Sequence, residues 1–257
     1  MATTCVFLQG TLEYEIRYSP SFSILEVRLT AGEQVAAEAG AMVYMTDGVE
    51  VRTRTRSGGF LQKVKVSVLG GESFFINDFV ATLPSKVGLA AGPLGDIGKL
   101  DVRPGHGYVV QSGGYIASTS GVQLDTQWQG FTKGIFGTSL FMLKASGVGD
   151  LFVNTFGAMD AHTLGAGEKI TVDNYHLVAF TEGCAYSVHK FGGLKSTILG
   201  GEGLVTEVVG PGEVLIQTKN PREFANWLAP FLPREREGEP GGESVRFKVG
   251  GVTIGKD

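Results

Sequence analysis

The sequence has little cysteine and little histidine, and neither residue is clustered. Its 257 residues include only Cys5 and Cys184, and neither belongs to a Cys-x-x-Cys pair. A disulfide framework or a structural zinc site needs more sulfur ligands than this, and the usage is compatible with a reducing compartment. No two of the four histidines lie within a few residues of each other, so the closely spaced pairs of metal-binding β-barrels are missing. We therefore expect no metal and no cofactor.

Signatures of catalysis and of phosphate binding are also absent. The sequence contains no Gly-x-Ser-x-Gly nucleophile elbow and no Gly-Lys-Ser/Thr phosphate loop. Its glycine-rich blocks, such as residues 70–73 and 200–203, favour bends or bulges in strands instead. We expect no catalytic residues, and a protein that is not an enzyme.

The sequence also has no large excess of charge of one sign and no long hydrophobic run. The 22 basic and 26 acidic residues leave a net charge of −4, so the chain has no overall electrostatic footprint for nucleic acid. Glycine and charge interrupt every apolar run before it reaches the roughly 20 residues of a membrane-spanning helix. Residues 1–10 lack the basic and apolar segments of a secretory signal. These observations predict a cytoplasmic protein that does not cross a membrane.

Glycine, in contrast, is abundant at 39 residues, and it marks an internal repeat. Three windows of equal length align without a gap, each with Ala-Gly or Pro-Gly at its third and fourth positions; they begin at Leu29, Val102 and Leu164. Such dipeptides suit tight turns between strands. A glycine-rich block follows each window, around Gly71, Gly137 and Gly201. The window and the glycine-rich block occur in the same order three times. This recurrence predicts a triplicated unit of about 60–70 residues.

Alternation of apolar and polar residues predicts that these units consist of β-strands. The alternation is clearest in residues 25–29, 63–68 and 169–173. We predict an all-β fold in which three pseudo-symmetric β-repeats form a sandwich-like or barrel-like domain, arranged around a pseudo-threefold axis. The predicted domain covers residues 1–219, with repeats at approximately 14–90, 91–150 and 151–219.

The tenth position of each window is polar, with Glu38, Gln111 and Asp173. Around a pseudo-threefold axis these side chains would converge, which makes them candidate ligand-binding positions. The simpler interpretation is that each side chain closes a local turn by accepting backbone N–H bonds.

One segment has the pattern of an amphipathic helix, at residues 220–233. Asn220 suits the N-cap, Pro221 suits the first turn and Glu223 suits a capping box. Its apolar side chains lie on one face, at Phe224, Trp227, Leu228 and Phe231. This face either covers the β-core or forms an interface with another subunit or a membrane surface.

The remaining residues, 234–257, predict a charged linker followed by a terminal strand. Proline, glycine and charged residues dominate the first part. Val245, Phe247 and Val249 then alternate with basic residues, which suits a last strand pairing with the body or with a neighbouring subunit.

Basic residues concentrate on one predicted hairpin, at Arg52, Arg54, Arg56, Lys63 and Lys65. The three arginines share one face of a strand. Such a stripe could meet anionic lipid or RNA phosphates. Its simpler role is to protect a solvated sheet edge from aggregation.

Several of these segments together resemble a known family. They are residues 38–45 (EAGAMVYM), 69–73, 118–122, 124–126, 192–196 and 200–206. In this order they are similar to the altered-inheritance-of-mitochondria (mitochondrial biogenesis) family, over roughly residues 14–230. The resemblance implies a fold like the tryptophan-RNA-binding attenuator protein, a short double-stranded β-helix. It also implies an association of mitochondrial relatives with the inner membrane, and it supplies no catalytic residues.

The sequence therefore predicts a non-enzymatic scaffold or interaction protein. We expect a homo-oligomer with a peripheral membrane or protein partner. The alternative is a binding module for RNA or another anionic ligand that uses the basic hairpin, and nucleic acid is the less favoured partner.

Overall fold

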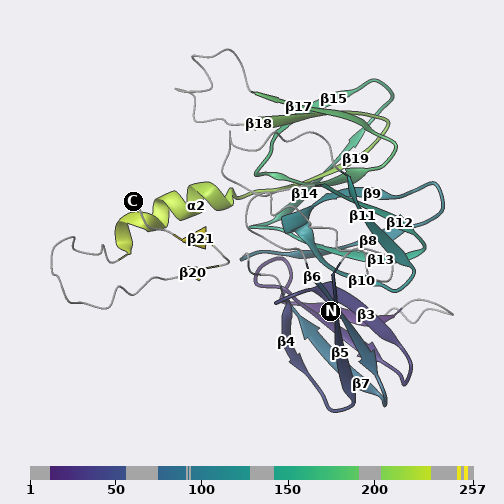
Figure 1. Ribbon diagram of the computed structural model, residues 1–257. Helices are drawn as coiled ribbons and strands as arrows, with labels where there is room; N and C mark the ends of the chain where they lie inside the picture. Colours follow the sequence, from purple (N-terminus) through teal and green to yellow (C-terminus); the bar gives the residue numbers. More distant parts are fainter. Residues whose placement is uncertain are drawn as a thin grey trace.

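The computed structural model describes residues 12–55, 75–90, 92, 94–127, 142–190, 204–232, 248–249 and 252–253, and nearly all of its regular structure is β-strand (Figure 1). A single short α-helix among these residues, α2 (Pro221–Leu228), follows the nineteenth strand. The all-β fold class with a short C-terminal helix is confirmed.

Most strands belong to four sheets, named here I to IV, and all neighbouring strands are antiparallel. Sheet I contains, in spatial order, β1 (Glu13–Arg17), β2 (Ile24–Leu29), β7 (Ser85–Leu89) and β4 (Met42–Met45). Sheet II contains β5 (Val49–Thr55), β6 (Phe75–Ala81), β3 (Gln34–Glu38), β10 (Tyr115–Thr119), β13 (Gly149–Asn154) and β8 (Ile97–Val102). Sheet III contains β11 (Val122–Gln127), β12 (Met142–Gly147), β9 (Tyr108–Gln111), β16 (Leu177–Thr181), β19 (Gly212–Gln217) and β14 (Met159–Leu164). Sheet IV contains β15 (Lys169–Asp173), β18 (Leu204–Val209) and β17 (Ala185–Lys190).

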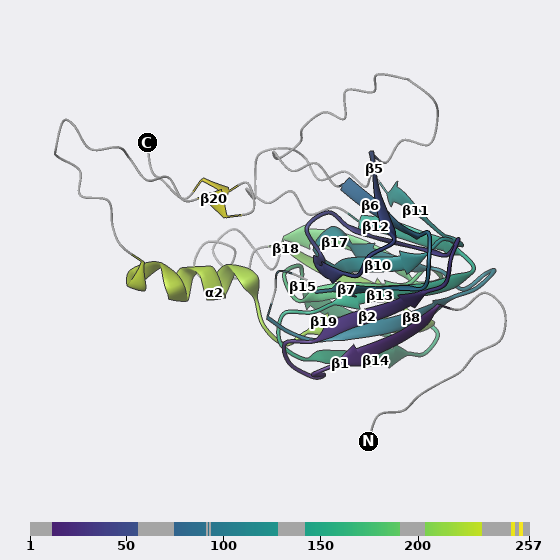
Figure 2. The same cartoon turned by 90° about the horizontal axis from the view of Figure 1, so that it is seen from below.

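The four sheets stack in the order I, II, III, IV, with a hydrophobic core in each of the three spaces between them. Core 1 joins sheet I to sheet II, for example through Val27 and Phe79. Core 2 joins sheets II and III, and core 3 joins sheets III and IV. Sheets I and IV therefore lie at opposite ends of the molecule, at the bottom and top of Figure 1, while Figure 2 looks along the stack from below. Among the described residues no sheet closes on itself, so the sandwich-like architecture is the one observed.

The strand order has a period of six. Adding six to each strand number of sheet II gives the order of sheet III. Each inner sheet is made of two halves from consecutive parts of the chain, which meet at β3–β10 in sheet II and at β9–β16 in sheet III. We call these two pairings the inner junctions. The pseudo-threefold axis stays a prediction.

Three equivalent glycine turns carry the chain from one sheet to the next. Gly32, Gly105 and Gly167 have φ values of +89°, +74° and +77°, a conformation that glycine adopts without strain. They follow β2, β8 and β14, and each returns the chain in the neighbouring sheet. The Ala-Gly and Pro-Gly dipeptides of the sequence windows lie at these turns.

A β-bulge also recurs at three equivalent places. The pairing register shifts between Met42 and Tyr44, between Tyr115 and Ala117, and between Leu177 and Ala179. A bulge places one extra residue in the strand and increases its twist. The strands β4, β10 and β16 therefore share the same local geometry.

Other segments agree with part of the sequence pattern. The strands predicted at residues 25–29 and 169–173 are β2 and β15. The strand predicted at residues 63–68 and the linker from residue 234 lie outside the described residues. Near the end, β20 (Lys248–Val249) pairs with β21 (Val252–Thr253). Within the described ranges, no helix combines the length and the apolar character needed to cross a bilayer.

Candidate functional site

Exposed aromatic side chains form a row that begins on α2 and continues into the short turn that follows it. Phe224, Trp227 and Phe231 are 38%, 62% and 71% exposed. Phe224 stacks on Trp227 with ring centroids 5.8 Å apart, and Trp227 lies 5.4 Å from Phe231. Leu228 is half-buried, and Leu232 extends the apolar face. We call these five residues the aromatic row.

Local sequence signals explain why this helix forms and where it stops. The Asn220 side chain accepts hydrogen bonds from the backbone N–H groups of Arg222 and Glu223, at 2.9 and 3.2 Å. Pro221 occupies the first turn, as the sequence predicted. Beyond Leu228 the chain continues as a short 3-10 turn, η2 (Ala229–Phe231).

Two contacts anchor the start of α2 to the β-stack, while its far end projects outward (Figures 1 and 2). The ring of Phe224 meets Phe156 edge-on at 5.1 Å. The Arg222 guanidinium lies 5.8 Å from the centre of the Tyr175 ring. The start of the helix therefore contacts the stack at Phe156 and Tyr175, and Trp227 and Phe231 remain exposed.

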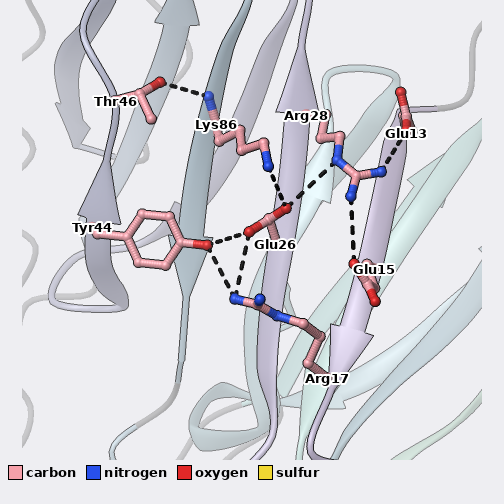
Figure 3. Close-up of polar contacts among 8 residues, drawn as sticks. All are labelled: Glu13, Glu15, Arg17, Glu26, Arg28, Tyr44, Thr46 and Lys86. Carbon is pink, nitrogen blue, oxygen red and sulfur yellow. Dashed lines mark hydrogen bonds and ion pairs between the residues drawn. The ribbon is translucent and has the colours of Figure 1, made fainter. Parts of the chain in front are cut away.

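A second candidate is a polar cluster on the outer face of sheet I, centred on the buried carboxylate of Glu26 (Figure 3). Tyr44 donates a hydrogen bond to Glu26 at 2.5 Å. Lys86 Nζ lies 3.2 Å from Glu26 Oε1, and guanidinium nitrogens of Arg17 and Arg28 each lie 3.5 Å from the carboxylate. Arg28 also binds the two remaining acids, Glu13 and Glu15.

Electrostatics hold Glu26 in its ionised form. The hydrogen bond from Tyr44 lowers the pKa of Glu26, burial opposes this, and Lys86 and Arg17 lower it further. The same hydrogen bond, together with burial, raises the pKa of Tyr44. The Tyr44 hydroxyl thus stabilises the ionised form of Glu26, and the Glu26 carboxylate stabilises the protonated form of Tyr44.

This cluster has the properties of a clamp rather than of a reactive site. Three cations face three carboxylates, so the six charged groups balance. The Glu26 oxygens already have a hydrogen-bond donor on β4 and cationic partners on β7, β2 and β1, which together are all the strands of sheet I (Figure 3). The cluster therefore links edge strand β4 to the rest of the sheet.

The basic hairpin is described only in part. Arg52 is exposed on β5, and its guanidinium lies 2.9 Å from Glu50 on the same strand. Arg54 is on the same strand, two residues further. Arg56, Lys63 and Lys65 lie outside the described residues, so the binding module for RNA or an anionic ligand stays a prediction.

The three equivalent polar positions end three strands in three different sheets. Glu38 ends β3, Gln111 ends β9 and Asp173 ends β15. The Asp173 carboxylate accepts a hydrogen bond from the Tyr175 N–H at 2.8 Å, within its own turn. Gln111 donates from Nε2 to the Asn174 carbonyl at 2.7 Å. The Asp173 contact closes a local turn, whereas Gln111 joins the end of β9 to the turn that follows β15.

The described ranges contain no assembled metal site. There, no group of three His, Cys, Asp or Glu side chains could hold a metal ion. Cys184 is buried in core 3, with its sulfur 3.5 Å from the Pro211 carbonyl oxygen. It packs as a small apolar side chain.

Sequence reasoning missed the Glu26 cluster. Its members are spread over residues 13–86, and only the sheet order brings them together. The one local signal is the alternation Glu26-x-Arg28 on a strand whose other positions are apolar, which indicates a polar face but not its partners.

The whole described β-stack can now be compared with known proteins. The sequence profile of a family described as mitochondrial biogenesis AIM24 matches residues 14–219, which include β2 to β19. The chain belongs to the AIM24 family. The family resemblance is thereby confirmed, and the likeness to the attenuator-protein fold stays a prediction.

Two bacterial proteins are similar to this AIM24 family member. A Streptococcus pyogenes serotype M6 protein, described only as uncharacterized, is 31% identical over 233 residues, which are 88% of this chain and 93% of the relative. The crystal structure of a Streptococcus pyogenes protein superposes with a TM-score of 0.73 at 30% identity, covering 86% of this chain and 100% of that one. Neither name states a biochemical activity.

Proposed function

We propose that this AIM24 family protein is a non-enzymatic scaffold that attaches peripherally to a membrane surface through the aromatic row of α2. The β-stack supplies a body of fixed shape, and α2 supplies the contact. The observation that carries the proposal is the exposure of Trp227 and Phe231 on a helix that projects from the stack.

The chemistry of the aromatic row suits the boundary between water and lipid. Trp and Phe side chains insert their rings at the headgroup level, and Trp keeps a polar N–H for the wet side. The opposite face of α2 carries Arg222, Glu223 and Asn226, which stay hydrated when the helix lies flat. The aromatic row therefore fits an interfacial position.

A single α2 helix would give weak attachment. Fully burying one large apolar side chain contributes about 1.5–3 kcal/mol, and ordering a short helix consumes part of this. Two or three aromatic side chains thus support reversible binding, in which several helices on one assembly would bind far more tightly than one.

The test is sedimentation of the full chain with phospholipid vesicles, prepared with and without an anionic phospholipid. The double variant Trp227→Ser/Phe231→Ser should lose vesicle binding by roughly tenfold or more, because each exposed ring contributes at least about 1 kcal/mol when buried. Val148→Ser is the matched control, since Val148 is a 61% exposed apolar residue in the turn between β12 and β13.

Equal binding by the two variants would remove α2 from the contact. Failure of the unaltered protein to bind either vesicle would contradict membrane attachment and favour a protein partner for the aromatic row. Circular dichroism and thermal unfolding check that both variants keep the β-stack.

A further inference from the structure

Each outer sheet of the stack corresponds in strand order to one half of an inner sheet. Sheet II consists of β5-β6-β3 joined to β10-β13-β8, and sheet III repeats this arrangement. Sheet IV contains only the counterpart of the first half, β17-β18-β15. Sheet I contains only the counterpart of the second half, β4-β7-β2, with β1 added. In the described part of the chain, β4 pairs only with β7 and β15 only with β18.

The strands left at these edges are the ones that form the inner junctions elsewhere. Strand β4 corresponds to β10 and β16, and β15 corresponds to β3 and β9. Every residue of β10 and of β16 is buried. In β4, by contrast, Met42 and Met45 are each 42% exposed, and Val43 is 56% exposed where its counterparts Ile116 and Val178 are 0% and 1% exposed. The edge strand β4 of sheet I is therefore apolar like β10 and β16, but it has no strand paired on its outer side in the described part of the chain.

The two open edges are unlike each other and lie at opposite ends of the stack (Figure 1). One molecule therefore cannot join its own β4 to its own β15 across the three cores. Two molecules can make this pairing, because sheet IV of one copy is the half-sheet that is missing beside β4 in sheet I of the next copy. Such a contact between unlike surfaces is head-to-tail.

We propose that β15 of one copy of this protein pairs antiparallel with β4 of a second copy, making the outer half-sheets into one sheet like sheets II and III. The inner junctions give the register. They pair Ala37 with Ala117 and Val35 with Thr119 in sheet II, and Val110 with Ala179 and Tyr108 with Thr181 in sheet III. The equivalent pairs between copies are Val172 with Tyr44, Thr171 with Met45, and Ile170 with Thr46.

Charges at the end of this register are complementary. Continuing the same antiparallel pairing by one residue sets Lys169 opposite Asp47 of the second copy. Both side chains are exposed, and Lys169 also contacts Glu207 on its own sheet at 3.0 Å. Opposite charges directly across a strand pair are stabilising, whereas like charges would oppose the register.

The Glu26 cluster prepares β4 for this role. Tyr44 is bound to Glu26 and through it to β2, β7 and β1. The Thr46 N–H donates to the Lys86 carbonyl of β7 at 3.0 Å. Because hydrogen-bonding direction alternates along a strand, the neighbouring Met45 N–H points to the open edge. The edge is thus held in place with its backbone groups directed outward.

Cysteine cross-linking tests the register directly in the full chain, with Cys5 replaced by serine. One batch carries Met45→Cys and another carries Thr171→Cys. Directly opposed residues in an antiparallel pair have Cβ atoms about 4.5–5.5 Å apart, close to disulfide reach. The mixed batches should form a disulfide-linked dimer under mild oxidation, and neither batch alone should do so. Lys169→Cys replaces Thr171→Cys in the matched control, which moves the thiol two residues along β15 and should give little product.

Each outcome of the cross-linking decides the proposal. A mixed dimer that depends on position 171 supports it. A dimer of Met45→Cys alone would mean that two β4 edges pair with each other, and would overturn it. Equal products at positions 169 and 171, or no product at all, would also overturn it.

Light scattering over about a hundredfold range of protein concentration tests the same contact without new thiols. The unaltered protein should show a mass above that of one chain, rising with concentration or fixed at a multiple when the copies close into a ring. Met45→Pro removes the outward N–H but not the bond of Thr46, so it should give a monomer. Met45→Val keeps the N–H and is the control that should still associate.

A monomeric unaltered protein, or association that survives Met45→Pro, would overturn the proposal. These measurements contain no lipid, so they are independent of the vesicle experiment. Failure of membrane attachment would leave the strand pairing between copies intact, and failure of the pairing would leave single-copy vesicle binding intact.

Discussion

At the scale of residues, Glu26 shows how a buried charge is retained in this protein. An isolated buried carboxylate is costly, but Glu26 has a hydrogen-bond donor or a cationic partner on each of four strands. Because all its partners belong to sheet I, any conformation that moves β4 away from β7 breaks the hydrogen bond from Tyr44. The cluster therefore makes the position of one edge strand dependent on the charge of one side chain.

The substitution Tyr44→Phe tests this dependence. It should destabilise the protein by about 1–2 kcal/mol at neutral pH, the cost of one hydrogen bond to a charged acceptor discounted for partial exposure. Denaturation with urea measures the change, and Tyr18→Phe is the control because Tyr18 is 69% exposed.

The loss should depend on pH in a defined direction. Glu26 has a pKa below its ordinary value of 4.5 in the folded protein, so its ionised form contributes stability above that value. This contribution disappears as the pH falls through the lowered pKa. The difference between Tyr44→Phe and the unaltered protein should therefore shrink in acid, and an equal difference at all pH values would contradict the role of the ionised carboxylate.

Individual turn and cap residues were readable from the sequence, whereas the buried charges were not. Gly32, Gly105 and Gly167 have positive φ values at the predicted turns, and Asn220 caps α2. These residues act on backbone groups within a few positions. Glu26 and Tyr44 depend on strands that are distant in the sequence, and no local pattern specifies such a partner.

At the scale of elements, β4 and β16 have the same local geometry in different surroundings. Both carry the bulge, and each pairs with the strand that comes three strands later in the chain, β7 or β19. Leu177 is 1% exposed in core 3, whereas its counterpart Met42 is 42% exposed. Only the neighbouring half-sheet distinguishes the two environments.

Alanine substitutions at these two positions should therefore differ. Leu177→Ala should cost about 2–5 kcal/mol, as for other buried large-to-small changes. Met42→Ala should cost less than about 1 kcal/mol in dilute protein, because little apolar surface is lost from the core. Chemical denaturation of both variants measures this, and similar losses would show that β4 is covered in the monomer.

Element types followed from the sequence better than element neighbours. Alternation located β2 and β15, because a half-buried strand repeats every two residues. The strands β10 and β16 are buried on both faces and lack such alternation. Their assignment to inner junctions came only from the sheet order.

At the scale of the whole molecule, the three cores are joined through shared sheets. Strands β3 and β10 lie side by side in sheet II, although one belongs to the first predicted repeat and the other to the second. Tyr115 of β10 strengthens this junction, because its hydroxyl donates to the Ala36 carbonyl at 3.2 Å. Each inner sheet therefore contains strands of two predicted repeats, and no predicted repeat forms both sheets around a core by itself.

Thermal unfolding should accordingly be a single cooperative transition. We expect the calorimetric enthalpy to equal the van't Hoff enthalpy in scanning calorimetry of the full chain. Leu143→Ala, in core 2, should lower the temperature of that one transition rather than split it. Three separate transitions would mean that the repeats fold independently in spite of the inner junctions.

The sequence repeat indicated the all-β class and the family, but not the stacked arrangement. A repeat of strands and turns is compatible with a closed ring of units as well as with an open stack. The choice depends on how each half-sheet meets the next, which involves pairs such as Val35 with Thr119 that lie far apart in the sequence.

The shared sheets also delay the completion of core 1 while the chain is being synthesised on the ribosome. Core 1 contains Phe152, whose ring meets Tyr14 edge-on at 4.9 Å. At about 5–20 residues per second, roughly 7–28 s separate the synthesis of these two residues. In the later part of that interval, once residue 89 has been added, the strands of sheet I and of the first half of sheet II are present without the later strands that complete core 1. A nascent chain of this protein therefore exposes apolar strands that a chaperone would need to shield.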